Sequence, residues 1–372
     1  MTAPRLTPTI ARPTPPPLPK IAFEEHFLVP EAMKKNPDGS IDETDVDFRG
    51  INGLDPRWFR QVYERLMDFD HTRIESMDEN NIDYAILSLM GPGIGAATDA
   101  RHAQDLARAC NDALAEKISQ RPDRYGGFAC LAIHDPEVAV KELERCVTEL
   151  GFKGVLFNGF SQVDLDDNLM YLDEDRCTPI WEALEALDVP LYLQPRPSDQ
   201  QMMYKDHREL ICANWGYACE TGTHVVQILV GGVLDRFPKA KLILGHLGEN
   251  LPFSAWRLQH WMEFNPGHDR PQRRIQDYLA DNVYVTISGN FSVPALMCTL
   301  QVMGSDRVLF SVDHPFENMD EASAFLDNAP ISEADRVKIA HANARELFKL
   351  PHPSANSLNA NRVIDDALWA AS

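Results

Sequence analysis

Eight short apolar segments alternate with long amphipathic segments from Lys20 onward, and this alternation constrains the fold more than any other feature. The apolar segments have the length of β-strands and span residues 21–27, 84–89, 126–133, 154–157, 190–193, 242–244, 283–287 and 308–311. Helical periodicity marks residues 103–119, 138–150, 178–187, 212–237, 250–264, 293–303 and 333–348. Alternating strand and helix units form parallel sheets, so eight of them predict an α/β fold with a closed (β/α)8 TIM barrel. An open doubly wound sheet is the alternative, but no GxGxxG or P-loop motif follows any predicted strand.

The barrel is expected to occupy residues 20–350 as a single domain with an extension at each end. Residues 1–19 contain seven prolines and predict a Pro-rich N-terminal arm, mobile or lying on a neighbouring subunit. Residues 351–372 predict a C-terminal extension with one short helix. Two polar stretches, 28–53 and 264–278, are expected as insertions on the catalytic face of the barrel.

The charge of the chain excludes several classes of partner, and its cysteines indicate the redox compartment. Against 56 Asp and Glu there are only 35 Lys and Arg, which gives a net charge of −21. So acidic a chain repels phosphate backbones and anionic lipid, so neither nucleic acid nor a membrane is expected as a partner. The seven cysteines form no CxxC pair, which is typical of free thiols in a reducing cytoplasm.

Carboxylates, imidazoles and amides recur where the predicted strands end, which is where TIM barrels place their chemistry. Glu24 and His26 are two residues apart, so both side chains point the same way and can bind one cation; a solvated pair is the alternative. Asp313 follows an apolar strand, as either a functional carboxylate or a helix N-cap. His246 and Glu249 are three residues apart, so the carboxylate can orient the imidazole; a helix-terminal Glu beside a packed His explains them equally well.

Six runs resemble the aromatic-acid decarboxylase branch of the amidohydrolase superfamily, which includes γ-resorcylate, 2,3-dihydroxybenzoate, salicylate and 5-carboxyvanillate decarboxylases. The runs are KIAFEEHF (20–27), LGFKGVLFNGFSQ (150–162), LILGHLGENLP (242–252), AWRLQHW (255–261), VTISGNF (285–291) and LFSVDHPFEN (309–318). They follow the family order across residues 20–350. The resemblance implies a distorted (β/α)8 barrel of the metal-dependent-hydrolase type.

The resemblance also implies one divalent metal ion, held by Glu24, His26, Gln194 and Asp313. Family members carry His before the proline of the fifth strand, whereas this chain has Gln194-Pro195. Zinc is the ion expected from the family. An amide oxygen is a weaker and harder ligand than imidazole. Gln194 can therefore ligate through its oxygen, which favours manganese or magnesium. The alternatives are a site with three protein ligands and a site that binds little metal.

The implied reaction is the non-oxidative decarboxylation of an ortho-hydroxylated aromatic acid by a carboxy-lyase. Asp313 would protonate the ring carbon that carries the carboxylate, which requires a raised pKa. His246 would bind a substrate oxygen with Glu249 orienting it, and Arg257 would pair with the substrate carboxylate. The expected pocket residues are Asn158, Ser288, Phe316, Phe27 and His314; His314 is either a second proton relay or part of the wall. Phe27, Phe160 and Phe291 either flank the ring or belong to the core.

Other functions compete with this hypothesis. A hydrolase of an ester, lactone or amide is the first alternative, although such barrels begin with HxH rather than Glu24-x-His26. A metal-poor variant that acts on a larger aromatic acid, and a barrel that only binds its ligand, are two further alternatives. The family resemblance implies a homodimer or homotetramer, with a small aromatic acid as the ligand.

Overall fold

The computed structural model describes residues 18–32, 56–164, 168–197, 204–264 and 271–351. All eight predicted strands are present, each beginning within two residues of its predicted start. They are β1 (Lys20–Phe27), β2 (Ile82–Leu89), β3 (Tyr125–Gly127), β4 (Val155–Asn158), β7 (Leu191–Gln194), β8 (Leu242–Leu244), β9 (Val283–Thr286) and β10 (Val308–Leu309).

The eight parallel strands close into a barrel in chain order. One sheet runs β1-β2-β3 and the other runs β10-β9-β8-β7-β4. Two isolated parallel bridges join them, Ala129 to Val155 at one junction and Glu25 to His314 at the other. The closed (β/α)8 barrel is therefore confirmed, with its two junctions irregular.

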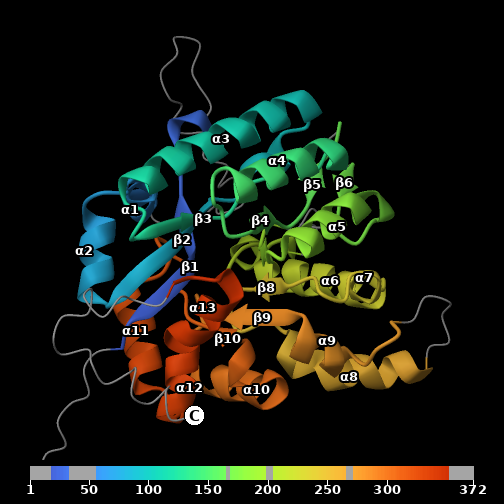
Figure 1. Cartoon of the computed structure of the whole chain (residues 1–372). Helices are drawn as coiled ribbons and strands as arrows, with labels where there is room; N and C mark the ends of the chain where they lie inside the picture. Colours follow the sequence, from blue (N-terminus) through green and yellow to red (C-terminus); the bar gives the residue numbers. More distant parts are fainter. Residues whose placement is uncertain (1–17, 33–55, 165–167, 198–203, 265–270, 352–372) are drawn as a thin grey trace, which may run out of the picture.

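Helices surround the strands (Figure 1). The outer helices are α1 (Pro56–Leu66), α2 (Thr72–Glu79), α3 (Ala100–Gln120), α4 (Pro136–Thr148), α5 (Thr178–Leu187), α6 (Gly216–Val230), α7 (Val233–Arg236), α8 (Leu251–Phe264), α9 (Ile275–Asp281), α10 (Val293–Met303), α11 (Met319–Asn328) and α12 (Glu333–Val337). A π-helical turn (Lys338–Ala342) leads into α13 (Asn343–Phe348). Short 3-10 turns occur at Pro30–Ala32, Gly93–Ala96, Asp175–Cys177, Arg208–Leu210 and Ser305–Arg307, and β5 (Ser161–Gln162) pairs with β6 (Leu169–Met170) as an antiparallel hairpin.

One helix prediction is wrong in its extent. The segment 212–237 is not a single helix, because Gly231 and Gly232 divide it into α6 and α7. Gly232 has a φ of 71°, a left-handed conformation that glycine adopts without strain. Helices α1, α2, α9 and α11 were not predicted.

The barrel interior has an apolar layer below a polar one. The apolar layer contains Ile21, Phe23, Ile86, Phe128, Leu156, Tyr192, Ile243 and Leu309. Phe348 of α13 packs on it, with ring centroids 5.1 Å from Phe23 and 5.7 Å from Phe128. Each of these strand residues precedes the polar end of its own strand, so the polar layer lies at the carboxyl ends. α13 covers the opposite end of the barrel (Figure 1).

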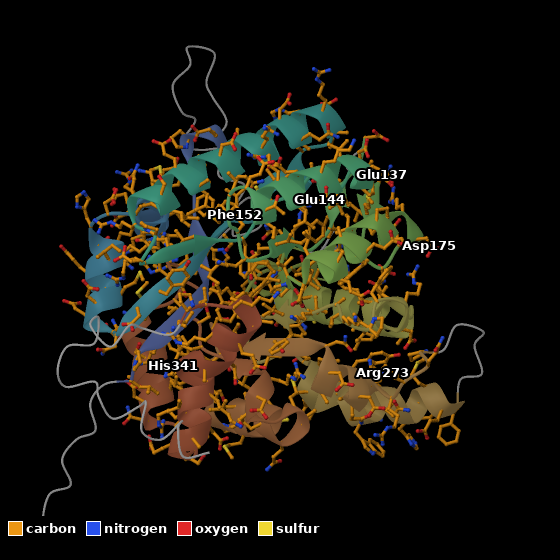
Figure 2. All side chains as sticks on the ribbon, viewed as in Figure 1. Glu137, Glu144, Phe152, Asp175, Arg273 and His341 are labelled. Atoms are coloured by element: carbon orange, nitrogen blue, oxygen red, sulfur yellow. The ribbon has the colours of Figure 1, made fainter. Side chains whose placement is uncertain are left out.

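The outer face is charged. Glu137 and Glu144 lie two turns apart on α4 and are exposed, and Asp175 is also exposed, whereas Phe152 nearby is buried (Figure 2). No helix in the described ranges combines the length and apolar character needed to cross a bilayer. The predicted N-terminal arm, the C-terminal extension and most of the 28–53 insertion lie outside the described residues.

Candidate active site

The carboxylate of Glu24 lies at the centre of a buried polar cluster at the carboxyl ends of the strands. Its Oε2 accepts hydrogen bonds from the hydroxyls of Tyr192, Thr286 and Ser288. Its Oε1 has no hydrogen-bond partner among the described residues. The three donors fix the orientation of the carboxylate, so that one oxygen is held and the other is available to a ligand.

His26 enters the same cluster from β1, as its two-residue spacing from Glu24 predicts. Its Nε2 lies 3.2 Å from Asp313 Oδ1 and 3.3 Å from Gln194 Nε2. Its Nδ1 lies 3.1 Å from the hydroxyl of Ser88 at the end of β2. The ends of β1, β2, β7 and β10 therefore bring these polar groups together.

His246 approaches the cluster from the segment after β8. Its Nδ1 lies 2.7 Å from Glu249 Oε1, which fixes the ring. Its Nε2 lies 3.6 Å from Glu24 Oε1 and 3.5 Å from Asp313 Oδ2. The structure thus brings together the residues predicted to be catalytic: His246, Glu249 and Asp313.

The backbone is strained where these side chains emerge. His246, Glu249 and Asp313 have φ values of 54°, 56° and 77°, which non-glycine residues rarely adopt. Gly289 (φ 59°) packs against the imidazole, since a β-carbon at this position would lie 2.7 Å from His246 Cδ2. Such conformations cluster at functional sites, and here they aim three side chains at one point.

The electrostatics of the cluster correct one expectation. Burial raises the pKa of Glu24. Burial also acts to lower the pKa of His246, but the carboxylates of Glu249 and Glu24 outweigh it and raise that pKa well above its ordinary value. Burial acts to raise the pKa of Asp313, but hydrogen bonds from His246 and His26 hold it below its usual range. The expected raised pKa of Asp313 is therefore wrong for this arrangement, because two imidazoles favour the ionised carboxylate.

The cluster fits a divalent cation. Ligand atoms of Glu24, His246 and Asp313 all lie within 4.8 Å of one another. Glu24 Oε1 and Gln194 Oε1 are buried without a hydrogen-bond partner in the described part of the chain, and Asp313 Oδ1 lies 3.2 Å from His26 Nε2. Unpaired buried oxygens are unfavourable, and a cation would satisfy those of Glu24 and Gln194. His246 is thus a metal-competent group that was not in the predicted ligand set.

Three predicted pocket residues lie at or beside the cluster. Ser288 is fully buried and binds Glu24, so it holds a candidate ligand in place. Asn158 ends β4 opposite Gln194 of β7. The ring of Phe316 lies 5.7 Å from the ring of His26.

Two other predicted substrate contacts are not brought to the cluster. Phe27 belongs to the outer hydrophobic core and packs against Phe69, with ring centroids 5.9 Å apart. Arg257 is exposed on α8, with its guanidinium 5.9 Å from the ring of Trp261. It lies six positions past Leu251, the first residue of α8, which is about 9 Å along the helix axis. Phe27 is a core residue, and the contact described for Arg257 is with Trp261 of its own helix.

His314 lies behind the barrel wall. It is buried, and burial together with the nearby charge of Arg73 lowers its pKa well below the ordinary value. Phe160 and Phe291 also pack locally, Phe160 4.2 Å under the guanidinium of Arg196 and Phe291 5.8 Å from Phe325. Of the two roles predicted for His314, part of the wall therefore fits better than a second proton relay.

The sequence analysis missed three residues of this site. Tyr192 and Thr286 each precede a chosen residue by two positions, Gln194 and Ser288, so strand alternation places them on the same face and identifies them. Glu317 follows Asp313 by four residues, and burial, reinforced by the charge of Asp313, raises its pKa to about 7. No spacing rule identifies Glu317, because it lies in a loop.

Comparison with known proteins places this geometry in a family. Residues 26–350 match the amidohydrolase family. The chain is 42% identical over 337 residues to a γ-resorcylate decarboxylase of Polaromonas sp. strain JS666, covering 89% of this chain and 98% of that protein.

Solved structures agree with the sequence match. A dihydroxybenzoic acid decarboxylase from Polaromonas sp. JS666, with bound manganese and the inhibitor 2-nitroresorcinol, superposes with a TM-score of 0.83 at 40% identity, covering 90% of this chain and 98% of that one. A 2,6-dihydroxybenzoate decarboxylase complexed with 2,6-dihydroxybenzoate also gives a TM-score of 0.83 at 40% identity, covering 90% and 100%. The barrel, its metal-competent cluster and these matches show that the chain belongs to the amidohydrolase family, in the branch of aromatic-acid decarboxylases.

Proposed function

We propose that this carboxy-lyase removes CO2 from a 2,6-dihydroxybenzoate-type acid without oxidation. The convergence of Glu24, His246 and Asp313 at the barrel mouth carries the proposal, since it combines a cation site with a proton donor. The relatives named for γ-resorcylate and 2,6-dihydroxybenzoate supply the substrate class.

Glu24, His26, Gln194 and Asp313 are the proposed ligands of one divalent ion, with His246 beside them. When bound, the ion would act as a Lewis acid that orients the substrate's carboxylate and phenol oxygens and stabilises their charge. We propose manganese rather than the zinc expected from the family. The manganese in the Polaromonas structure and the amide oxygen of Gln194 both support this choice.

The proton for the ring carbon would come from the His246–Asp313 pair. Glu249 fixes Nδ1 of His246, so the proton on Nε2 faces Asp313 Oδ2 at 3.5 Å. Burial acts to lower the pKa of His246, but the carboxylates of Glu249 and Glu24 raise it, which favours the protonated imidazole. Asp313 would receive that proton and deliver it to the ring carbon that carries the carboxylate; the carbon–carbon bond then breaks, CO2 leaves and the aromatic ring is restored.

The active form is proposed to be a homo-oligomer assembled through α8. This helix exposes four large side chains, with 86% of Phe253, 68% of Trp256, 56% of Trp261 and 66% of Phe264 accessible. A contiguous apolar face of this kind marks an interface. Arg257 lies on the same helix, so its proposed pairing with a substrate carboxylate would be made across the subunit boundary. All seven cysteines are free, which supports the proposed cytoplasmic location.

The test is CO2 release from the manganese-loaded protein with 2,6-dihydroxybenzoate, 2,3-dihydroxybenzoate and salicylate, with and without chelator. We expect release from 2,6-dihydroxybenzoate that chelator abolishes and manganese restores. Asp313→Asn removes the group that would deliver the proton and should lower kcat at least 1,000-fold, on the scale of removing an essential proton carrier. No release from any of the acids, together with hydrolysis of an aryl ester or lactone, would instead support the hydrolase alternative.

A further inference from the structure

Backbone hydrogen bonds and side chains together hold the junction between β1 and the segment after β10; the backbone bonds run from the His26 amide to the His314 carbonyl (2.7 Å) and from the Asp313 amide to the Glu24 carbonyl (2.9 Å). The two strands share one isolated bridge, from Glu25 to His314, and no continuous ladder. The hydroxyl of Ser311 fills this junction. It accepts hydrogen bonds from the backbone amides of Phe23 (3.0 Å) and Glu24 (2.6 Å), and it donates to Glu25 Oε1 (3.1 Å).

The same two amides lie where β1 changes phase. Ile21 and Phe23 face the apolar layer of the barrel interior, whereas Glu24 and His26 face the polar cluster above it. A regular strand alternates with period two, so it cannot place both Phe23 and Glu24 inside. The pairing of β1 with β2 shifts register between Ala22 and Glu25, which marks an irregularity of the bulge type. Ser311 supplies the acceptor that the two consecutive amides need at this position.

Glu25 and Arg73 extend this arrangement on the outer side of β1. Glu25 is 1% exposed, and its Oε1 also accepts a hydrogen bond from the amide of Val312 (3.0 Å), next to Asp313. Arg73 is also 1% exposed, and its Nη2 donates to the carbonyl of His26 (2.6 Å) while its Nε donates to the carbonyl of Asp68 (2.8 Å). These bonds therefore hold the backbone of Glu24 and His26 directly. They also hold the residue that precedes Asp313.

We propose that Ser311, Glu25 and Arg73 form a brace behind β1 that sets the affinity of the cluster for its metal ion. They are positioning residues, because they act on the backbone of the ligands and not on substrate. This inference rests on the proposed metal site. Partners outside the ligand shell typically change metal affinity by about 10- to 100-fold when they are removed.

The direct test is manganese binding to the full-length Ser311→Ala variant, measured by the electron paramagnetic resonance signal of free Mn²⁺ ions. We expect the Kd to rise about 10- to 100-fold, since two buried amides lose their acceptor and the bulge relaxes. Ser323→Ala is the matched control. Ser323 is also buried, but its hydroxyl donates to the carbonyl of Asn80 on the outer helices (3.4 Å), so its removal should leave the Kd unchanged.

The Ser311→Cys variant keeps the test decisive if the alanine variant does not fold. A thiol fills the space of the hydroxyl but is a weak donor and acceptor, so manganese binding should still weaken. A folded Ser311 variant with wild-type affinity, or equal losses in the Ser311 and Ser323 variants, would overturn the brace. Failure of the decarboxylase proposal is seen separately, as wild-type protein that binds manganese but releases no CO2.

Discussion

Gln194 is the residue at which the proposed metal site departs from the pattern that the family resemblance implies. It ends β7 inside the cluster, with its Nε2 3.3 Å from His26 Nε2 and its Oε1 unpaired among the described side chains. A neutral amide attracts a transition metal less than an imidazole does and discriminates less strongly in favour of zinc. If the proposed metal site is correct, this position would affect which ion the protein selects.

Gln194→His should tighten zinc binding at least 10-fold and manganese binding less, because imidazole suits zinc better than an amide oxygen does. Competition with a chromophoric chelator measures both constants. The exposed Gln227→His on α6 is the control for adding an imidazole elsewhere. Unchanged zinc affinity would show that residue 194 does not reach the metal.

A second residue, His224, is expected to make the stability of the fold sensitive to acid. It is fully buried on α6, and its Nε2 accepts a hydrogen bond from the amide of Leu172 (3.0 Å). Burial lowers its pKa to about 3, whereas the unfolded chain has the ordinary value of about 6.5. Between these values the unfolded state binds a proton that the folded state does not, so the free energy of unfolding falls as pH falls.

The expected contribution from His224 is a loss of about 2 kcal/mol between pH 6.5 and pH 5, at about 1.4 kcal/mol per pH unit. Urea unfolding at the two pH values measures it. His224→Gln cannot titrate and should lose correspondingly less stability over the same interval. An identical pH dependence in both proteins would contradict the assignment.

At the scale of elements, the strand ends determine the chemistry. The segment after β9 carries Ser288 and Gly289, which hold Glu24 and leave room for His246. The segments after β8 and β10 supply the left-handed residues that aim His246, Glu249 and Asp313. Small backbone changes in these segments should therefore affect catalysis more than folding.

Gly289→Ala tests this expectation. The left-handed φ of 59° should cost about 1–2 kcal/mol, and the added methyl would press on the imidazole of His246 at 2.7 Å. We expect kcat to fall at least 10-fold while the protein remains folded. Gly232→Ala is the control, since Gly232 also has a left-handed backbone (φ 71°, ψ 22°) and its added Cβ would meet Asp235 Oδ2 at an ordinary 3.5 Å, away from His246. Equal kcat values for the two variants would refute the steric argument.

At the scale of the whole molecule, α8 carries four of the seven large hydrophobic side chains that are exposed in the described ranges. The four aromatic side chains on it include Trp256, which stacks on His260 with ring centroids 4.8 Å apart. Helices that expose this much aromatic surface are stabilised by covering it, since apolar burial contributes about 25 cal/mol per Å². A second copy of the chain is the proposed partner.

Trp256→Glu should weaken self-association at least 10-fold, because it places a charge in the proposed interface. Analytical ultracentrifugation measures the distribution of species. Trp215→Glu is the matched control, since Trp215 is 53% exposed on a different element, at the start of α6. A wild-type protein that sediments as a monomer would refute the interface, as would a Trp256 variant that associates normally.

The sequence by itself determined the barrel and most of its polar layer. Eight apolar segments with interleaved helices specify closure, and Glu24, His26, His246 and Asp313 follow from their positions at strand ends, because backbone periodicity is a local property. Helices α2, α9 and α11 were missed because they are short or weakly periodic, whereas α1 carries a clear amphipathic pattern over 11 residues that the sequence analysis did not use.

Only the tertiary structure decided where Phe27, Arg257 and His314 lie, and that Tyr192 and Thr286 hold Glu24. The phase change in β1 places Phe23 and Glu24 on the same side and turns Phe27 outward, and Ser311, which follows β10 and is distant in sequence, supports it. The low pKa of Asp313 is likewise a property of the assembled site, since it depends on two imidazoles from other segments. Contacts between distant segments and the burial they create set these features, and no local pattern encodes them.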